Sequence, residues 1–341
     1  MLLTPRQSQI FQAIVEDYIS FAEPVGSRTI SKKFNMQISS ATIRNEMADL
    51  EELGLIAQPH LSSGRVPTQK GLRFYIDCLV EIDRLSKEEE DLISNIKKEY
   101  EVKKQHIRNL MKDISKTLSN VLQCPSMVTI PRLLSESFKK IQFLLLDETN
   151  LVITIVSKTG LIEHFETKID NFGTTQEKLN EIAKTLNTLP DGFTLQQVNS
   201  ALETGGGIKG AKQILSSSGM DLNNADERIF LNGTENIFKN PEFQDSENVK
   251  LFIRIFNDKE KLLKIIDDNK TRTLKNDTLI LIGNELIDLE SLSLGLVASE
   301  YRASTETNGI IGIIGPSRMD YCRAISLIRE MATKISDIFI H

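Results

Sequence analysis

The chain has 341 residues, of which 26% are charged and 40% hydrophobic, and its net charge is −6. This length predicts two or three domains, and the composition is ordinary for a soluble globular protein. No apolar run reaches the roughly 18 residues that a membrane-spanning helix needs, and the first residues lack the basic flank and apolar core of a signal peptide. The three cysteines are far apart and form no CxxC pair, so we expect reduced thiols in a cytoplasmic protein without a zinc site.

The first helix is predicted to begin at Thr4, with Pro5 in its first turn, because this pair is a strong start signal. The segment Glu23–Gly26 interrupts the chain before a second helix over residues 27–34. A third helix is predicted over residues 39–53 and ends at Gly54.

A short ribbon is predicted after the third helix. Residues 55–60 and 66–68 are its two strands, and residues 61–65 form the turn with Gly64 and Arg65. Another short helix follows over residues 70–82. Helix, turn, helix and ribbon in this order predict a winged helix-turn-helix over residues 1–82.

The third helix has two distinct faces. Ile43, Met47 and Leu50 recur at helical spacing and are predicted to pack inward. On the other face, Arg44 and Asn45 have the chemistry to bond guanine and adenine edges, and small neighbours allow the helix to sit deep in a groove. An ordinary amphipathic helix with solvated charges would show the same pattern, so the ribbon is needed to favour DNA binding.

The charge balance argues against a simple DNA-binding domain. Residues 1–80 hold eight Lys or Arg and eight Asp or Glu, so this part of the chain is neutral. DNA binding therefore requires that the basic side chains share one face while the acidic ones lie elsewhere.

A long polar helical stretch covers residues 86–123. Ile107, Leu110, Ile114, Leu118 and Val121 recur at close to heptad spacing. We interpret residues 83–100 as a linker between domains. A plain surface helix of the following domain is an equally good interpretation.

The rest of the chain alternates strands and helices. Three antiparallel strands are predicted over residues 138–168 and three more over residues 277–314, with helices over residues 176–189 and 320–339. Six strands with helices predict one α+β domain in two halves, residues 101–190 and 271–341. Residues 191–270 are predicted to be a mostly helical insertion with one strand at residues 228–231.

No catalytic or metal site emerges from the sequence. The stretch Gly205–Lys212 departs from phosphate-loop spacing, because Ala211 stands where the lysine belongs. The four histidines are scattered, and no paired carboxylates stand out. We therefore expect neither an enzyme nor a cofactor.

Several motifs together resemble the HrcA family of bacterial heat-inducible repressors. They are Glu23–Arg28, Ser40–Met47, Gly64–Thr68, Gly71–Tyr75, Leu231–Asn236, Pro241–Phe243 and Gly315–Tyr321. The resemblance runs from the first residues to the last helix. It implies that the split α+β domain is GAF-like and that the insertion helps to form a homodimer.

The resemblance also implies a function. A homodimer would bind an inverted-repeat operator called CIRCE before chaperone operons such as groE and dnaK and block their transcription, and the chaperonin GroEL would keep it active. The expected DNA-binding residues are Arg28, Lys32, Ser40, Ala41, Thr42, Arg44, Asn45, Arg65, Lys70 and Arg73.

Two other functions remain open at this point. The first is a metabolite-responsive regulator with the same DNA reader and a small ligand in the GAF-like domain. The second is a winged helix used for protein contact without DNA, which the neutral charge of residues 1–80 favours.

Overall fold

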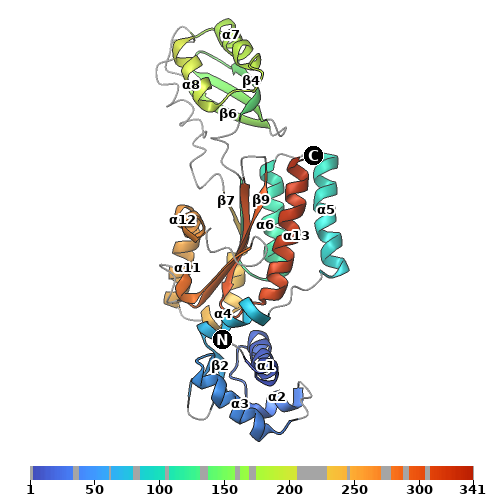
Figure 1. Cartoon of the computed structure of the whole chain (residues 1–341). Coiled ribbons are helices and arrows are strands. Elements are labelled where there is room, and N and C mark those ends of the chain that lie inside the picture. The colour runs from blue at the N-terminus through green and yellow to red at the C-terminus, as the bar shows by residue number, and fades with distance from the viewer. Residues whose placement is uncertain are drawn as a thin grey trace.

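The protein is a row of three bodies, with the winged-helix region at one end and a small sheet with two helices at the other (Figure 1). A larger sheet with helices on both faces lies between them. The computed structural model describes residues 3–33, 38–60, 63–79, 85–103, 107–130, 137–157, 162–168, 174–205, 229–243, 246–269, 278–286, 292–303 and 308–340.

The first body has the predicted order of elements. They are α1 (Pro5–Phe21), α2 (Ser27–Lys33), α3 (Ser40–Glu52), β1 (Ile56–Ala57), β2 (Val66–Pro67), α4 (Gln69–Phe74) and the π-helical turn η1 (Tyr75–Leu79). Thr4 caps α1 as predicted, and its hydroxyl accepts a hydrogen bond from the Gln7 amide. Ile10, Ile14, Ile30 and Leu50 are fully buried, so helices α1, α2 and α3 share one core.

The ribbon of this body lies very close to its neighbours. A Cβ atom built on Gly71 would stand 2.0 Å from the carbonyl oxygen of Leu55, and one on Gly64 would stand 2.5 Å from the carbonyl of Val25. Both neighbours are backbone atoms, which cannot move away as a flexible side chain can. Only glycine therefore allows α4 and the wing to pack at these positions.

The central sheet has five strands in the order β7-β3-β10-β9-β8, all antiparallel. Three separate parts of the chain supply them. The strands are β3 (Ser126–Thr129), β7 (Ile229–Asn232), β8 (Thr278–Ile282), β9 (Leu294–Arg302) and β10 (Asn308–Pro316). Strand β3 was not predicted from the sequence.

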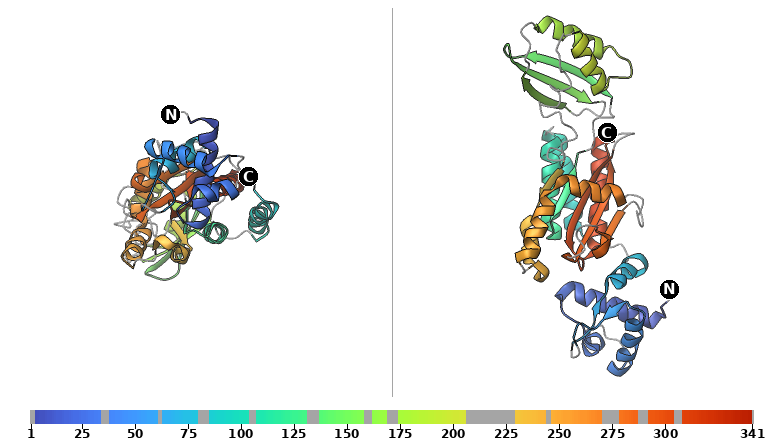
Figure 2. Two further views of the ribbon diagram at one scale, coloured as in Figure 1. Left: turned by 90° about the horizontal axis from the view of Figure 1, so that it is seen from below. Right: turned by 90° about the vertical axis from the view of Figure 1, so that its left-hand side faces the viewer.

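Helices cover both faces of this sheet (Figure 2). Val128, Ile280 and Ile311 join the apolar cluster that contains buried residues of α6 (Ile107–Leu122) and α13 (Tyr321–Ile340). Met127 and Leu279, their neighbours in sequence, join a second cluster with α11 (Ser246–Asn257) and α12 (Lys259–Asn269). Alternate residues of one strand thus enter different cores, as expected for a sheet buried on both sides.

The segment proposed as a linker belongs largely to this central body. Helix α5 (Lys87–Lys103) lies beside α13, where Ile93 is buried and Glu89 forms an ion pair with Arg323 at 2.7 Å. Burial of the carboxyl group is outweighed by its bonds to Ser86 and Arg323, and the pKa of Glu89 is lowered. The alternative interpretation, a surface helix of the next domain, is the correct one for α5.

The small body at the far end has its own three-stranded sheet, in the order β4-β5-β6. Its elements are β4 (Phe138–Leu145), β5 (Asn150–Ser157), β6 (Ile162–Lys168), α7 (Gln176–Asn187) and α8 (Leu195–Thr204). Phe138, Ile141 and Phe143 of β4 are buried, and the side chains between them are exposed. The sheet therefore has one covered face and one open face.

The prediction that the six strands belong to one α+β domain is wrong, although an interrupted α+β domain is confirmed. The strands of residues 138–168 do not pair with those of residues 278–316, and residues 229–269 supply β7, the short 3-10 turns η4 (Thr234–Lys239) and η5 (Pro241–Phe243), and two helices to the central body. The interruption thus begins near residue 137, earlier than the expected 191–270, and its described part contains three strands. Strand β3, just before it, pairs with β7, just after it.

The described helices include none that combines the length and apolar character needed to cross a membrane.

Replacing Gly71 with alanine should destabilise the winged-helix body by about 1–3 kcal/mol, the usual cost of overpacking a rigid site. Gly26→Ala is the matched control, because its nearest neighbour would be the Thr29 side chain at 3.8 Å. Thermal unfolding of the full chain, with hydrogen exchange of residues 5–79, measures the effect. Equal stability of the two variants would contradict the close approach of Gly71 to Leu55.

Candidate nucleic-acid interface

Helix α3 presents the predicted polar face to solvent. Its N-cap is Ser39, whose hydroxyl accepts a hydrogen bond from the Thr42 amide at 3.1 Å. Ile43 and Met47 are buried on the inner side, whereas Arg44 and Asn45 are exposed. Of the other proposed contacts on this helix, Ala41 is exposed, and Ser40 and Thr42 are half-buried.

Three of the four acidic residues of α3 make contacts within their own domain. Glu46 forms an ion pair with Arg6 at 3.4 Å, and Glu51 forms one with Arg65 at 2.9 Å. Asp49 accepts a hydrogen bond from the Gln7 side chain at 3.5 Å. The negative charges thus face α1 and the base of the wing, so the neutral domain has the charge segregation that DNA binding requires.

The basic side chains of α2 differ in their surroundings. Arg28 and Lys32 are exposed, and neither they nor Arg44 form an ion pair with any residue that the structure describes. Lys33 instead pairs with Asp17 of α1 and lies over the Phe21 ring. Because α2 packs on α3, free cations stand next to the recognition helix.

Two proposed contacts at the wing have partners inside the domain. The backbone of Arg65 bonds to that of Val25 in both directions, at 2.8 and 2.9 Å, and its guanidinium holds Glu51. The ammonium group of Lys70 donates to the carbonyl of Leu53 at 2.8 Å, at the end of α3, and remains exposed. The wing tip at residues 61–62 lies outside the described residues.

Arg73 does not belong to this surface. Its guanidinium forms an ion pair with Glu285 and donates to the carbonyl of Ile280 at 2.8 Å, both in the central body. The prediction that Arg73 contacts phosphate is therefore wrong, because its guanidinium is paired with Glu285 at the interface between the winged-helix body and the central body. Sequence reasoning missed this role, and it also missed Arg6 and Gln7, whose partners lie 40 and 42 residues away.

No other chemical site stands out in the part of the chain that the structure describes. It contains no group of three or more His, Cys, Asp or Glu side chains able to hold a metal. Cys78, Cys124 and Cys322 form no disulfide bond, and burial raises the pKa of Cys124 to about 11. The glycine-rich stretch from Gly206 to Lys212 lies outside the described residues.

Comparison with known proteins agrees with this geometry. Residues 2–75 match the family described as "Winged helix-turn-helix transcription repressor, HrcA DNA-binding", and residues 108–325 match "HrcA protein C terminal domain". The fold and the exposed face of α3 thus define a winged-helix transcription regulator.

Full-length similarity makes the assignment specific. Proteins named "Heat-inducible transcription repressor HrcA" from Desulforamulus reducens and Clostridium perfringens are each 34% identical to this chain. The similarity covers 98% of this chain and 97–98% of each relative. The chain therefore belongs to the HrcA family. A crystal structure described as a hypothetical protein shares the fold, with a TM-score of 0.65, 23% identity and 99% coverage of both chains.

Two alanine variants should separate base reading from phosphate contact. Arg44→Ala should weaken binding to the operator more than binding to random DNA, because a bidentate base contact supplies about 1–3 kcal/mol of discrimination. Lys32→Ala should weaken both about equally and reduce the salt dependence by about one contact. Fluorescence titrations over a range of salt concentrations provide the measurement, and equal behaviour of both variants would remove the base-reading role of Arg44.

Proposed function

We propose that this protein is a heat-inducible transcriptional repressor that binds double-stranded DNA through α2, α3 and the wing. The observation that carries the proposal is the arrangement around α3. Glu46 and Glu51 of α3 form ion pairs within the domain, and Arg28, Lys32, Arg44 and Asn45 remain exposed on the outer side. Family membership supports the repressor role, because the similar full-length proteins carry that name.

The proposed contacts divide into two kinds. Ser40, Ala41, Thr42, Arg44 and Asn45 lie on the first two turns of α3, where side chains and free helix amides meet the major groove. Arg28, Lys32 and Lys70 would contact phosphates on either side, and Arg65 would place the wing. Phosphate contacts fix the register of the protein on the duplex, and the α3 contacts read the sequence.

The operator is proposed to be an inverted repeat bound by a homodimer. A dimer with twofold symmetry places its two recognition helices on equivalent half-sites. The family resemblance implies the CIRCE element before the groE and dnaK operons, where occupancy blocks transcription.

The open face of the β4-β5-β6 sheet supports the proposal of a dimer. Leu144 is 55% exposed and Ile162 is 48% exposed, and the register sets Leu144 opposite Val152 and Ile162 opposite Val156. Leu146, just beyond β4, is 57% exposed. These two apolar pairs lie on one uncovered sheet face, on either side of the polar row of Gln142, Thr154 and His164. Exposed apolar side chains on an uncovered sheet favour a contact surface, and we assign it to the same surface of a second copy.

GroEL is proposed as the partner that maintains the folded repressor. The central sheet needs strands from three distant parts of the chain, and such non-local pairing folds slowly. Apolar strands such as β8 and β10 are exposed until the sheet closes, which favours aggregation.

Selection from a random duplex pool tests the central proposal. The full-length protein should enrich an inverted repeat whose half-sites are read by equivalent helices. The Arg44→Ala variant should enrich a less restricted half-site. Recovery of no inverted repeat from the unaltered protein would favour a winged helix that binds protein instead of DNA.

A charge on the open sheet face should separate the proposed dimer. Leu144→Glu should give a monomer in sedimentation and reduce affinity for the full inverted repeat at least tenfold, because the half-sites would be bound singly. Affinity for an isolated half-site should be unchanged. Leu189→Glu is the control, since Leu189 is also exposed but follows α7 on the other side of the small body. A dimeric Leu144→Glu protein would place the contact elsewhere.

Refolding tests the chaperonin proposal. After dilution from guanidinium, the operator-binding fraction should be low for the protein alone and several times higher with GroEL and its cofactors. The difference should grow with protein concentration. Full recovery without the chaperonin at all concentrations would refute a folding role for GroEL.

A further inference from the structure

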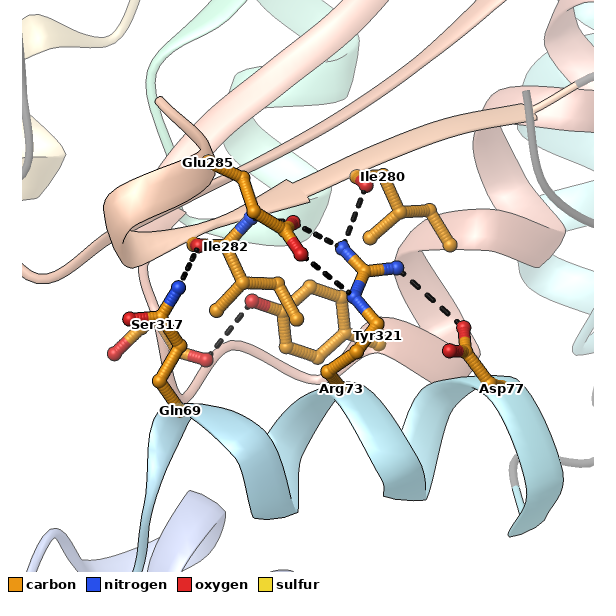
Figure 3. A network of polar contacts seen from close by, with 8 residues as sticks. All are labelled: Gln69, Arg73, Asp77, Ile280, Ile282, Glu285, Ser317 and Tyr321. Carbon is orange, nitrogen blue, oxygen red and sulfur yellow. Dashed lines mark hydrogen bonds and ion pairs between the residues drawn. The ribbon is translucent and has the colours of Figure 1, made fainter. Parts of the chain in front are cut away.

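The winged-helix body and the central sheet meet at the side of strand β8 (Figure 3). Strand β8 is an edge strand of the five-stranded sheet and pairs only with β9 among the described strands. Helix α4 lies against its other side and contributes Gln69 and Arg73. An edge strand has outward N–H and C=O groups, which form a template for another strand unless something covers them.

Side chains of α4 donate hydrogen bonds to the outward carbonyl groups of this edge. Arg73 donates to the carbonyl of Ile280 at 2.8 Å, and Gln69 donates to that of Ile282, also at 2.8 Å. These two residues are two positions apart in an antiparallel strand, so their carbonyls point to the same side. The α4 side chains thus take the place that a sixth strand would have.

Glu285 completes the arrangement. Its carboxylate accepts from Arg73 and, at 2.9 Å, from the amide of Ile282. Arg73 and Glu285 are largely buried, with side-chain exposures of 19% and 28%, so the pair is partly shielded from solvent. We call Gln69, Arg73 and Glu285 the edge clasp.

The clasp closely fits the turn after β8. Gly283 has a φ of +53°, and a Cβ on it would stand 3.0 Å from the Gln69 side chain. A second contact between the two bodies comes from the turn between β10 and α13, where Arg318 donates a hydrogen bond to the carbonyl of Ile19 at 3.0 Å. These bonds involve single side chains, and beneath them the two bodies share one apolar cluster that includes Leu72 of α4 and Ile280 of β8. Opening the clasp therefore also exposes apolar side chains.

We propose that the winged-helix body is the cover of the β8 edge, and that heating opens the edge clasp and exposes β8 for edge-to-edge pairing with a second copy of this chain. Loss of the DNA-binding arrangement and self-association would then be one event. The strand suits this pairing, because Thr278–Ile282 is a short β-branched and apolar segment without charge or proline. The proposal deepens the heat response in the proposed function, but its test does not use DNA.

Hydrogen exchange of the full-length protein on stepwise heating tests the proposal, with light scattering on the same samples. The variants are Arg73→Ala, Gln69→Ala and the conservative Glu285→Gln. Lys70→Ala is the matched control, because Lys70 lies on the same helix and bonds only within the winged-helix body. Peptides over residues 278–286 should exchange at least five times faster in the clasp variants than in the control, and scattering should begin at a lower temperature.

Three outcomes would overturn the proposal. One is unchanged exchange over residues 278–286 in all clasp variants. Another is an equal acceleration in β9 and β10, which would indicate general destabilisation. The third is faster exchange at β8 without concentration-dependent scattering, which would refute the pairing of copies. Operator titration of the unaltered protein at 25 °C is independent, so failure of the proposed function would be seen separately.

Discussion

The central sheet is the constraint on which the rest of the structure depends. Its five strands come from residues 126–129, 229–232 and 278–316, so it cannot close until most of the chain is present. The register places β3 between β7 and β10. The buried hydroxyl of Tyr301, on β9, donates a hydrogen bond to the carbonyl of Thr129, on β3. The small body is inserted in the chain between β3 and β7. The winged-helix body contacts β8, which is the edge strand opposite β7. Both outer bodies are therefore positioned by one sheet.

Local elements could be predicted from the sequence because their signals are local. Thr4 with Pro5, and the stripe of Ile43, Met47 and Leu50, each lie within a few turns of helix, and both predictions are confirmed. The heptad-like stripe of α6 is buried at Leu110, Ile114 and Leu118.

The sequence did not predict which strands belong to the same sheet, because strands that pair over a long separation share no local sequence signal. One signal was nevertheless available. In the sequence of β4, Lys139, Lys140 and Gln142 interrupt the apolar residues, whereas β8 is apolar throughout after Thr278. The first pattern fits a one-sided sheet, and the second fits a sheet covered on both faces. The role of Arg73 was hidden for a different reason: in sequence it looks like another cation of the winged helix, and only its neighbour Glu285, 212 residues later, assigns it to the interface.

The docking of Arg73 on β8 also has a consequence for biosynthesis. The winged-helix body is made first, but Ile280, whose carbonyl accepts a hydrogen bond from Arg73, lies 207 residues further along the chain. At about 5–20 residues per second, this separation is on the order of 10–40 s of translation. During that interval the nascent chain already contains α4, but the β8 edge that α4 will cover has not yet been synthesised.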